Sequence, residues 1–132
     1  MKLLLDTHIW IWSYLDPERL GSRVRRALES GANELWLSPV SVWETAVLAD
    51  TGRVKLAGHS VTDWVTRALA ETPLRDAPMN REVALETRAV RLEHDDPADR
   101  WLAATARVFD LALVTADERV LRGSGFRTMK NR

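Results

Sequence analysis

The sequence predicts an α/β fold in which a short, mostly parallel sheet of about four to five strands is flanked by helices. Short apolar runs, each closed by polar residues, alternate along the chain with longer amphipathic segments. Strands that alternate with helices in this way form parallel sheets that are covered on both faces. The length of 132 residues fits one domain, so we expect residues 1–132 to form a single unit.

The strands are expected at the shortest apolar runs of the chain. Each run is about as long as a typical strand and is bounded by residues that favour turns or helix starts. The run at 111–115 has the most strand-like composition, and the last run is expected to add an edge strand. In chain order the expected strands are residues 3–5, 34–38, 74–77, 111–115 and 126–129.

The helices are expected between these runs, and turn residues set their bounds. Asp16-Pro17 interrupts the first helix, and Ser22 is the expected cap of the second. Pro39 and Pro97 each stand at the first position of a helix, where a missing N–H costs nothing. In chain order the expected helices are residues 8–15, 22–31, 39–50, 60–70, 81–92, 97–108 and 117–121.

Composition and charge exclude several classes of protein. The chain has no cysteine and therefore neither disulfides nor thiolate ligands, so oxygen or imidazole must hold any bound metal. The 19 basic and 19 acidic residues cancel, which argues against a polybasic nucleic-acid binder. Asp6 ends the first apolar run too early for a signal peptide, and no run approaches the ~18 apolar residues of a membrane span. We therefore expect a cytoplasmic protein with no membrane partner.

Acidic residues fall where a parallel sheet places its ligand site, beyond the carboxyl ends of the strands. Asp6 directly follows the first strand, and Asp117 lies two residues after the strand at 111–115. Glu44 lies in the helix after the second strand, and Asp99 lies in the first turn of the helix that leads into 111–115. If neighbouring strands carry these elements, the four carboxylates meet. Such a cluster must take up protons or bind a hard cation such as Mg²⁺ or Mn²⁺.

Each acid also has an explanation that needs no ligand. Asp96 is the natural N-cap of the helix that follows it, and the helix dipole favours acids such as Asp99 and Asp117 in a first turn. Glu44 could be a solvated helix residue. Asp6 is harder to explain in this way, because an acid that ends a buried run is costly unless it is paired, capped or liganded.

Histidine and tryptophan add little to this site from the sequence alone. His8 stands close enough to Asp6 to be a ligand, but a histidine on a helix surface or in the core is the simpler interpretation. His59 and His94 have no partner at metal-binding spacing. The six tryptophans could stack bases, although most of them stand at amphipathic positions that favour the core or an interface.

Four segments together resemble the acidic motifs of PIN domains. They match in order and in spacing, and the resemblance covers essentially the whole chain. It is greatest to the VapC-type toxins of bacterial toxin–antitoxin pairs. The segments are LLLDTH at 3–8, SPVSVWE at 38–44, DPADRWLAATA at 96–106 and LVTADE at 113–118.

The resemblance implies a metal-dependent endoribonuclease built on a single PIN-like domain. It places the catalytic and metal-binding acids at Asp6, Glu44, Asp99 and Asp117, with Mg²⁺ or Mn²⁺ as the cofactor. Asp6 and Asp99 are expected to be direct ligands. Glu44 and Asp117 are expected to bind through water or to complete a second site. Thr115 resembles the small hydroxyl residue that often lines such a site.

The same resemblance implies a substrate and partners. The expected substrate is structured RNA, such as the loops of tRNA or ribosomal RNA, cut to leave 5′-phosphate and 3′-hydroxyl ends. The expected protein partners are a second copy of the chain, in a homodimer, and a VapB-like antitoxin. The antitoxin tail would lie over the site and insert an arginine. Trp10, Trp12 and Trp64 are candidate docking positions for it.

Two alternatives stay open at this point. The first is another Mg²⁺-dependent phosphoryl-transfer enzyme of α/β fold. A haloacid-dehalogenase-type phosphatase needs a second acid where His8 stands, and a response-regulator receiver needs a lysine after a late strand, which is missing here. The second is a catalytically silent PIN-like binding module that keeps its acids for stability or for seating a partner's arginine. Mg²⁺-dependent cleavage of structured RNA by the free protein distinguishes the nuclease from the silent binding module.

Overall fold

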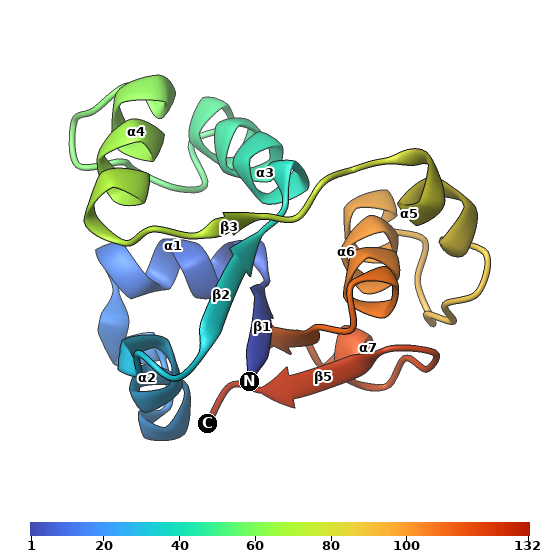
Figure 1. Ribbon diagram of the computed structural model, residues 1–132. Helices are drawn as coiled ribbons and strands as arrows, with labels where there is room; N and C mark the ends of the chain where they lie inside the picture. Colours follow the sequence, from blue (N-terminus) through green and yellow to red (C-terminus); the bar gives the residue numbers. More distant parts are fainter.

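One sheet of five parallel strands runs through the middle of the molecule (Figure 1). The computed structural model describes residues 1–132. The strands are β1 (Lys2–Leu5), β2 (Glu34–Leu37), β3 (Arg75–Asp76), β4 (Ala112–Thr115) and β5 (Arg127–Lys130). Their order across the sheet is β3-β2-β1-β4-β5, and every pairing is parallel, which confirms the predicted α/β class.

Helices follow the strands in the predicted alternation, and a short 3-10 helix at Pro17–Arg19 follows the first of them. No helix combines the length and the apolar character that a membrane span requires. The helices are α1 (Thr7–Leu15), α2 (Ser22–Glu29), α3 (Pro39–Asp50), α4 (Val61–Glu71), α5 (Arg81–Glu86), α6 (Pro97–Val108) and α7 (Glu118–Leu121).

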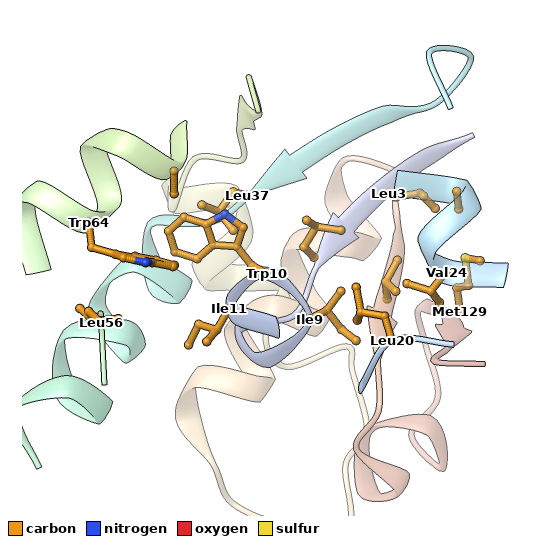
Figure 2. Packing of buried hydrophobic residues seen from close by; sticks show 14 residues of the cluster. Leu3, Ile9, Trp10, Ile11, Leu20, Val24, Leu37, Leu56, Trp64 and Met129 are labelled. Atoms are coloured by element: carbon orange, nitrogen blue, oxygen red, sulfur yellow. The ribbon is translucent and has the colours of Figure 1, made fainter. Parts of the chain in front are cut away.

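Successive residues of β1 pack into two cores on opposite faces of the sheet. Leu3 and Leu5 join one core with residues of α1, α2 and α4 (Figure 2). In this core Trp10 meets Trp64 edge to face, with the ring centroids 5.1 Å apart. Leu4 joins the other core, to which α6 contributes most. Because both faces are covered, the central strand is apolar at three successive residues, Leu3 to Leu5, rather than alternating.

The helix predicted at residues 81–92 is shorter than expected, because α5 ends at Glu86. Arg100 of α6 accounts for the early end. Its guanidinium Nη1 donates to the carbonyl oxygens of Thr87 and Val90, both at 3.1 Å. These carbonyls are bound by a distant side chain instead of by amides further along a helix.

The N-cap of α2 is Gly21 rather than the predicted Ser22. A Cβ on Gly21 would lie 1.9 Å from the backbone carbonyl carbon of Arg132, so only glycine fits at this position. The same close approach places the Arg132 carbonyl oxygen 3.1 Å from the Val24 amide, which it accepts from. The Arg132 carbonyl therefore accepts from one amide of the helix start that a capping side chain would otherwise bind.

Replacing Trp10 with alanine should lower the free energy of unfolding by about 3–5 kcal/mol, the usual cost of removing a buried aromatic ring. Trp10 is only 1% exposed, and urea denaturation measures the change. Trp43 is 62% exposed, so Trp43→Ala is the matched control and should cost less than about 1 kcal/mol. Equal losses in the two variants would contradict the core position of Trp10.

Candidate metal centre

Two of the predicted acids follow neighbouring parallel strands. Asp6 follows β1 and caps α1, where its Oδ1 accepts a hydrogen bond from the Thr7 amide at 2.8 Å. Asp117 lies two residues after β4 and caps α7 by accepting from the Arg119 amide at 2.9 Å. Because β1 pairs directly with β4 in parallel, the two acids lie at the same edge of the sheet.

The other two predicted acids come from α3 and α6, which contact each other (Figure 1). Glu44 lies in α3, and Asp99 lies in the first turn of α6. Together with Asp6 and Asp117 they line one cavity of about 380 Å³. The structure thus brings together all four acids whose convergence the sequence predicted. The cavity is also lined by His8, Trp12, Arg19, Asp96, Ala116 and Arg119.

Thr115 connects the two acids that follow strands. Its hydroxyl donates to Asp6 Oδ2 at 2.6 Å, and its oxygen accepts from the Asp117 amide at 3.1 Å. Burial raises the pKa of Asp6 from 3.8 to about 6, although the hydrogen bond from Thr115 favours the charged form. Repulsion by Asp99 and Asp117 adds to the rise. Asp6 is thus held in place and is costly to ionise at the same time.

Glu44 is held by the first residue of α1. The Thr7 hydroxyl is hydrogen-bonded to Glu44 Oε1, and it lies 3.0 Å from the Ser41 hydroxyl. Burial raises the pKa of Glu44 from 4.5 to about 7, against the effect of the Thr7 hydrogen bond. Repulsion by Asp6 and Asp99 raises this pKa further. Thr7 and Ser41 could not be identified as site residues from the sequence, because a hydroxyl beside an apolar run is common.

His94 has a partner in the site, although no partner stands at metal-binding spacing in the sequence. Its Nε2 lies 2.7 Å from Asp99 Oδ2, and the two side chains are only 12% and 10% exposed. Burial raises the pKa of Asp99, and the hydrogen bond with His94 opposes that rise. His94, Asp99 and Asp117 each offer one ligand atom, and these atoms lie within 4.8 Å of one another. The five-residue separation of His94 and Asp99 spans a helix start, so no periodicity signals the contact.

Asp117 differs from the other three acids because it is paired with a cation. Arg119 donates to its two carboxylate oxygens, from Nε at 3.3 Å and from Nη2 at 2.9 Å. These bonds lower the pKa of Asp117. The carboxylate therefore stays charged at pH values where Asp6 is protonated. Arg119 is a site residue that the sequence analysis missed, although it stands in the first turn of the helix that Asp117 caps.

Asp96 is the N-cap of α6, as predicted. Its Oδ1 accepts from the amides of Ala98 at 2.9 Å and Asp99 at 3.4 Å. The same side chain lines the cavity, so the capping role does not remove its charge from the site. Asp96 therefore adds to the negative potential and raises the pKa of Asp99.

The tryptophans considered as docking positions divide into core and rim residues. Trp10 and Trp64 are 1% and 6% exposed, so the prediction that they dock a partner is wrong. Trp12 lines the cavity, with the His8 ring centroid 5.7 Å from its own and the Arg19 guanidinium 5.1 Å from its ring. His8 likewise lies at the cavity wall, beside Trp12.

The donor set of the cavity fits a hard divalent cation. Its lining offers five carboxylates and the His8 imidazole, in a chain without cysteine, and His94 lies beside Asp99. Two like charges ~5 Å apart repel by about 3 kcal/mol at an effective dielectric of ~20. The raised pKa values of Asp6 and Glu44 reflect mainly burial and, to a smaller extent, this repulsion, and a bound cation would offset both. Oxygen-rich sites of this kind suit Mg²⁺ or Mn²⁺.

Known proteins share both the sequence pattern and the fold. The family model described as the PIN domain matches residues 3–125. The chain is also similar to Ribonuclease VapC22 of Mycobacterium tuberculosis, with 36% identity over 119 residues, which cover 89% of this chain and 88% of that protein.

Solved structures resemble the fold at low sequence identity. VapBC2 from Rickettsia felis, bound to a DNA fragment from its promoter, gives a TM-score of 0.72 at 14% identity over 98% of both chains. DNA-bound VapBC from Salmonella typhimurium gives a TM-score of 0.69 at 21% identity, over 100% of this chain and 99% of that chain. At these identities the likeness shows the fold alone.

The metal-free protein should lose stability as the pH rises from about 4 to about 7. Asp6 keeps its proton up to about pH 6 when folded, whereas its ordinary pKa is 3.8. The folded state therefore binds more protons than the unfolded state in this interval, and folding becomes less favourable as they are lost. For Asp6 alone the loss amounts to roughly 3 kcal/mol. Urea denaturation in EDTA at several pH values measures it.

Asp6→Asn is the control for this prediction, because it removes the ionisation and keeps a side chain that can cap α1. The pKa of His8 is lowered by burial and acts in the opposite direction, but His8 is common to both proteins and cancels in the comparison. The free energy of unfolding of Asp6→Asn should therefore fall less than that of the wild type between about pH 4 and about pH 7. Identical pH profiles would contradict the burial of an ionisable Asp6.

Proposed function

The chain belongs to the PIN-domain family, and from this premise we propose that it is a metal-dependent endoribonuclease acting as the toxin of a type II toxin–antitoxin pair. Its 36% identity to Ribonuclease VapC22 supports the enzyme class. The observation that carries the proposal is the convergence of Asp6, Glu44, Asp99 and Asp117 on one cavity at the carboxyl edge of a parallel sheet. Residues 1–132 would act as one nuclease unit.

The four carboxylates are the proposed catalytic and metal-binding residues. Asp6 and Asp99 are the most buried of them, with 8% and 7% of the whole residue exposed, and we assign them as direct ligands. Glu44 and Asp117 bind through water or complete a second cation position. The proposed cofactor is Mg²⁺ or Mn²⁺. When bound, such a cation supplies positive charge to the phosphate under attack and activates water for hydrolysis.

The remaining residues of the cavity orient the acids and receive the substrate. The hydroxyls of Thr115 and Thr7 hold the carboxylates of Asp6 and Glu44. Arg119 and Arg19 line the same cavity and are the cations placed to bind RNA phosphates there. Local arginines of this kind offset the acidic site in a chain whose net charge is zero.

The proposed substrate is structured RNA, with tRNA and ribosomal RNA loops as the leading candidates and 5′-phosphate and 3′-hydroxyl product ends. RNA loops expose unpaired bases that a protein can bind by stacking, and Trp12 lies at the cavity wall. The proposed protein partners are a VapB-like antitoxin and a second copy of the chain. The VapBC complexes from Rickettsia felis and Salmonella typhimurium, which share this fold, support the antitoxin assignment.

Asp6→Asn and Asp99→Asn should each reduce Mg²⁺- or Mn²⁺-dependent cleavage of structured RNA by roughly a hundredfold or more. The reason is that each change removes one charged oxygen donor from the cavity, and even outer partners of metal sites cost ~10–100-fold. Gel assays with antitoxin-free protein measure the rate, and circular dichroism verifies that the variants fold.

Asp110→Asn is the matched control. The Asp110 side chain is 88% exposed and outside the cavity, and asparagine tolerates its positive φ of 55°. This variant should cleave at the wild-type rate. Cleavage that survives both Asp6→Asn and Asp99→Asn would remove the assignment and point to a contaminating nuclease or to a different site.

Sequencing RNA 5′ ends after induced expression should find phosphate-bearing ends concentrated in the loops of one class of structured RNA. The cavity, at about 380 Å³, is small relative to a folded RNA, so a protruding strand is expected to bring its phosphate to the acids. Cells that express Asp6→Asn should lack these ends. Ends scattered over unstructured messenger RNA would contradict the structured substrate.

A further inference from the structure

His94 lies in the segment between α5 and α6. It does not line the acid cavity but contacts Asp99, which does. Its side chain is only 12% exposed, which is unusual for a residue in a connecting segment. Its Nε2 lies 2.7 Å from Asp99 Oδ2, and that is its one hydrogen bond. The other ring nitrogen, Nδ1, is buried and has no partner.

This pattern determines the direction of the bond. Asp99 must be charged to bind a cation, and a charged carboxylate only accepts, so in that state Nε2 carries the hydrogen and donates it to Asp99. Leaving Nδ1 buried without a partner costs stability, and a leucine or methionine would fill the same space without that cost. The imidazole is therefore poorly explained as core packing. Its single polar contact is directed at one oxygen of one acid.

The segment that carries His94 is anchored by contacts that do not involve the imidazole. Arg91 and Ser124 exchange backbone hydrogen bonds in an isolated antiparallel bridge, each at 3.0 Å. Glu93 accepts from Arg122 at 3.0 Å. These contacts are independent of residue 94, so a substitution there should leave the segment in place and change mainly what Asp99 meets.

We propose that His94 is a positioning residue for cation binding: it holds Oδ2 of Asp99 through Nε2 and leaves Oδ1, which accepts no hydrogen bond from the protein, to face the ion. The inference rests on the proposed role of Asp99 as a cation ligand. It assigns His94 a place behind that ligand rather than in direct contact with the ion. Outer partners of this kind fix the orientation of a ligand before the ion arrives, which strengthens binding.

A direct role for the imidazole is the competing arrangement, because His94, Asp99 and Asp117 offer atoms within 4.8 Å of one another. The geometry disfavours it. Nε2 is already engaged by Asp99, and Nδ1 is shielded from the cavity. Binding an ion through Nε2 would break the only hydrogen bond of the ring and leave Oδ2 of Asp99 without its donor.

Mn²⁺ affinity of the intact chain at fixed pH and salt, measured from the free-ion EPR signal, tests the proposal. Glutamine can place an amide N–H near the position of Nε2, whereas asparagine places it near Nδ1. His94→Gln should therefore bind Mn²⁺ within about threefold of wild type, and His94→Asn and His94→Leu should bind about 10–100-fold more weakly. If the leucine variant fails to fold, the Gln and Asn pair carries the test alone.

His59→Leu is the matched control. His59 also bonds an aspartate, because its Nδ1 lies 2.7 Å from Asp63 Oδ2, but this pair lies at the exposed start of α4, away from the cavity. This variant should leave Mn²⁺ affinity unchanged. Wild-type affinity in His94→Asn would overturn the proposal, as would an imidazole nitrogen bonded directly to Mn²⁺ in electron spin-echo spectra. Wild-type affinity in Asp99→Asn would instead remove the proposed role of Asp99 itself, so the two failures are distinguishable.

Discussion

The parallel pairing of β1 with β4 is the constraint on which the rest of the site depends. It places Asp6, which follows β1, beside Thr115, which ends β4. The Thr115 hydroxyl there donates to Asp6 and accepts from the Asp117 amide. A slip of one residue in this register would turn the Thr115 hydroxyl to the other face of the sheet. The contact between segments 109 residues apart therefore depends on a register that the two hydrophobic cores enforce.

That arrangement buries mutually repelling carboxylates at a place where a bound cation would offset their repulsion. The cores on both faces bury the strand ends, and burial is the main reason that the pKa values of Asp6 and Glu44 rise to about 6 and about 7. Only Asp117 has an arginine of its own, and its pKa falls. A cation bound by these acids would therefore couple its binding to folding, because the acids come together only in the folded chain.

Local signals account for most of what the sequence predicted. Asp6 after an apolar run and Asp96 before Pro97 are features of a few consecutive residues, and the structure places both where they were expected. The positions of β1, β2 and β4 follow from the same kind of signal, although each strand differs from its predicted bounds by one residue at one end. Convergence of the acids was predictable because parallel strands place their carboxyl ends at one edge.

The features that were missed depend on contacts between distant segments. α5 ends early because Arg100 binds carbonyls beyond it, and nothing within residues 81–92 reports that contact. The resemblance led to Trp10 as a docking position, and the sequence did not correct this, because α1 is apolar on most of its circumference and its buried side cannot be told from its outer side. The contact of His94 with Asp99 likewise depends on how the segment before α6 folds back.

The convergence of the acids on a cation is tested most directly by anomalous scattering from a crystal of the protein soaked in Mn²⁺. The account predicts an anomalous peak in the cavity, bound to carboxylate oxygens of Asp6 and Asp99, with the His94 nitrogen on the far side of Asp99. A cavity without a peak at Mn²⁺ concentrations that support cleavage would contradict it. So would a peak held only by acids outside the cavity.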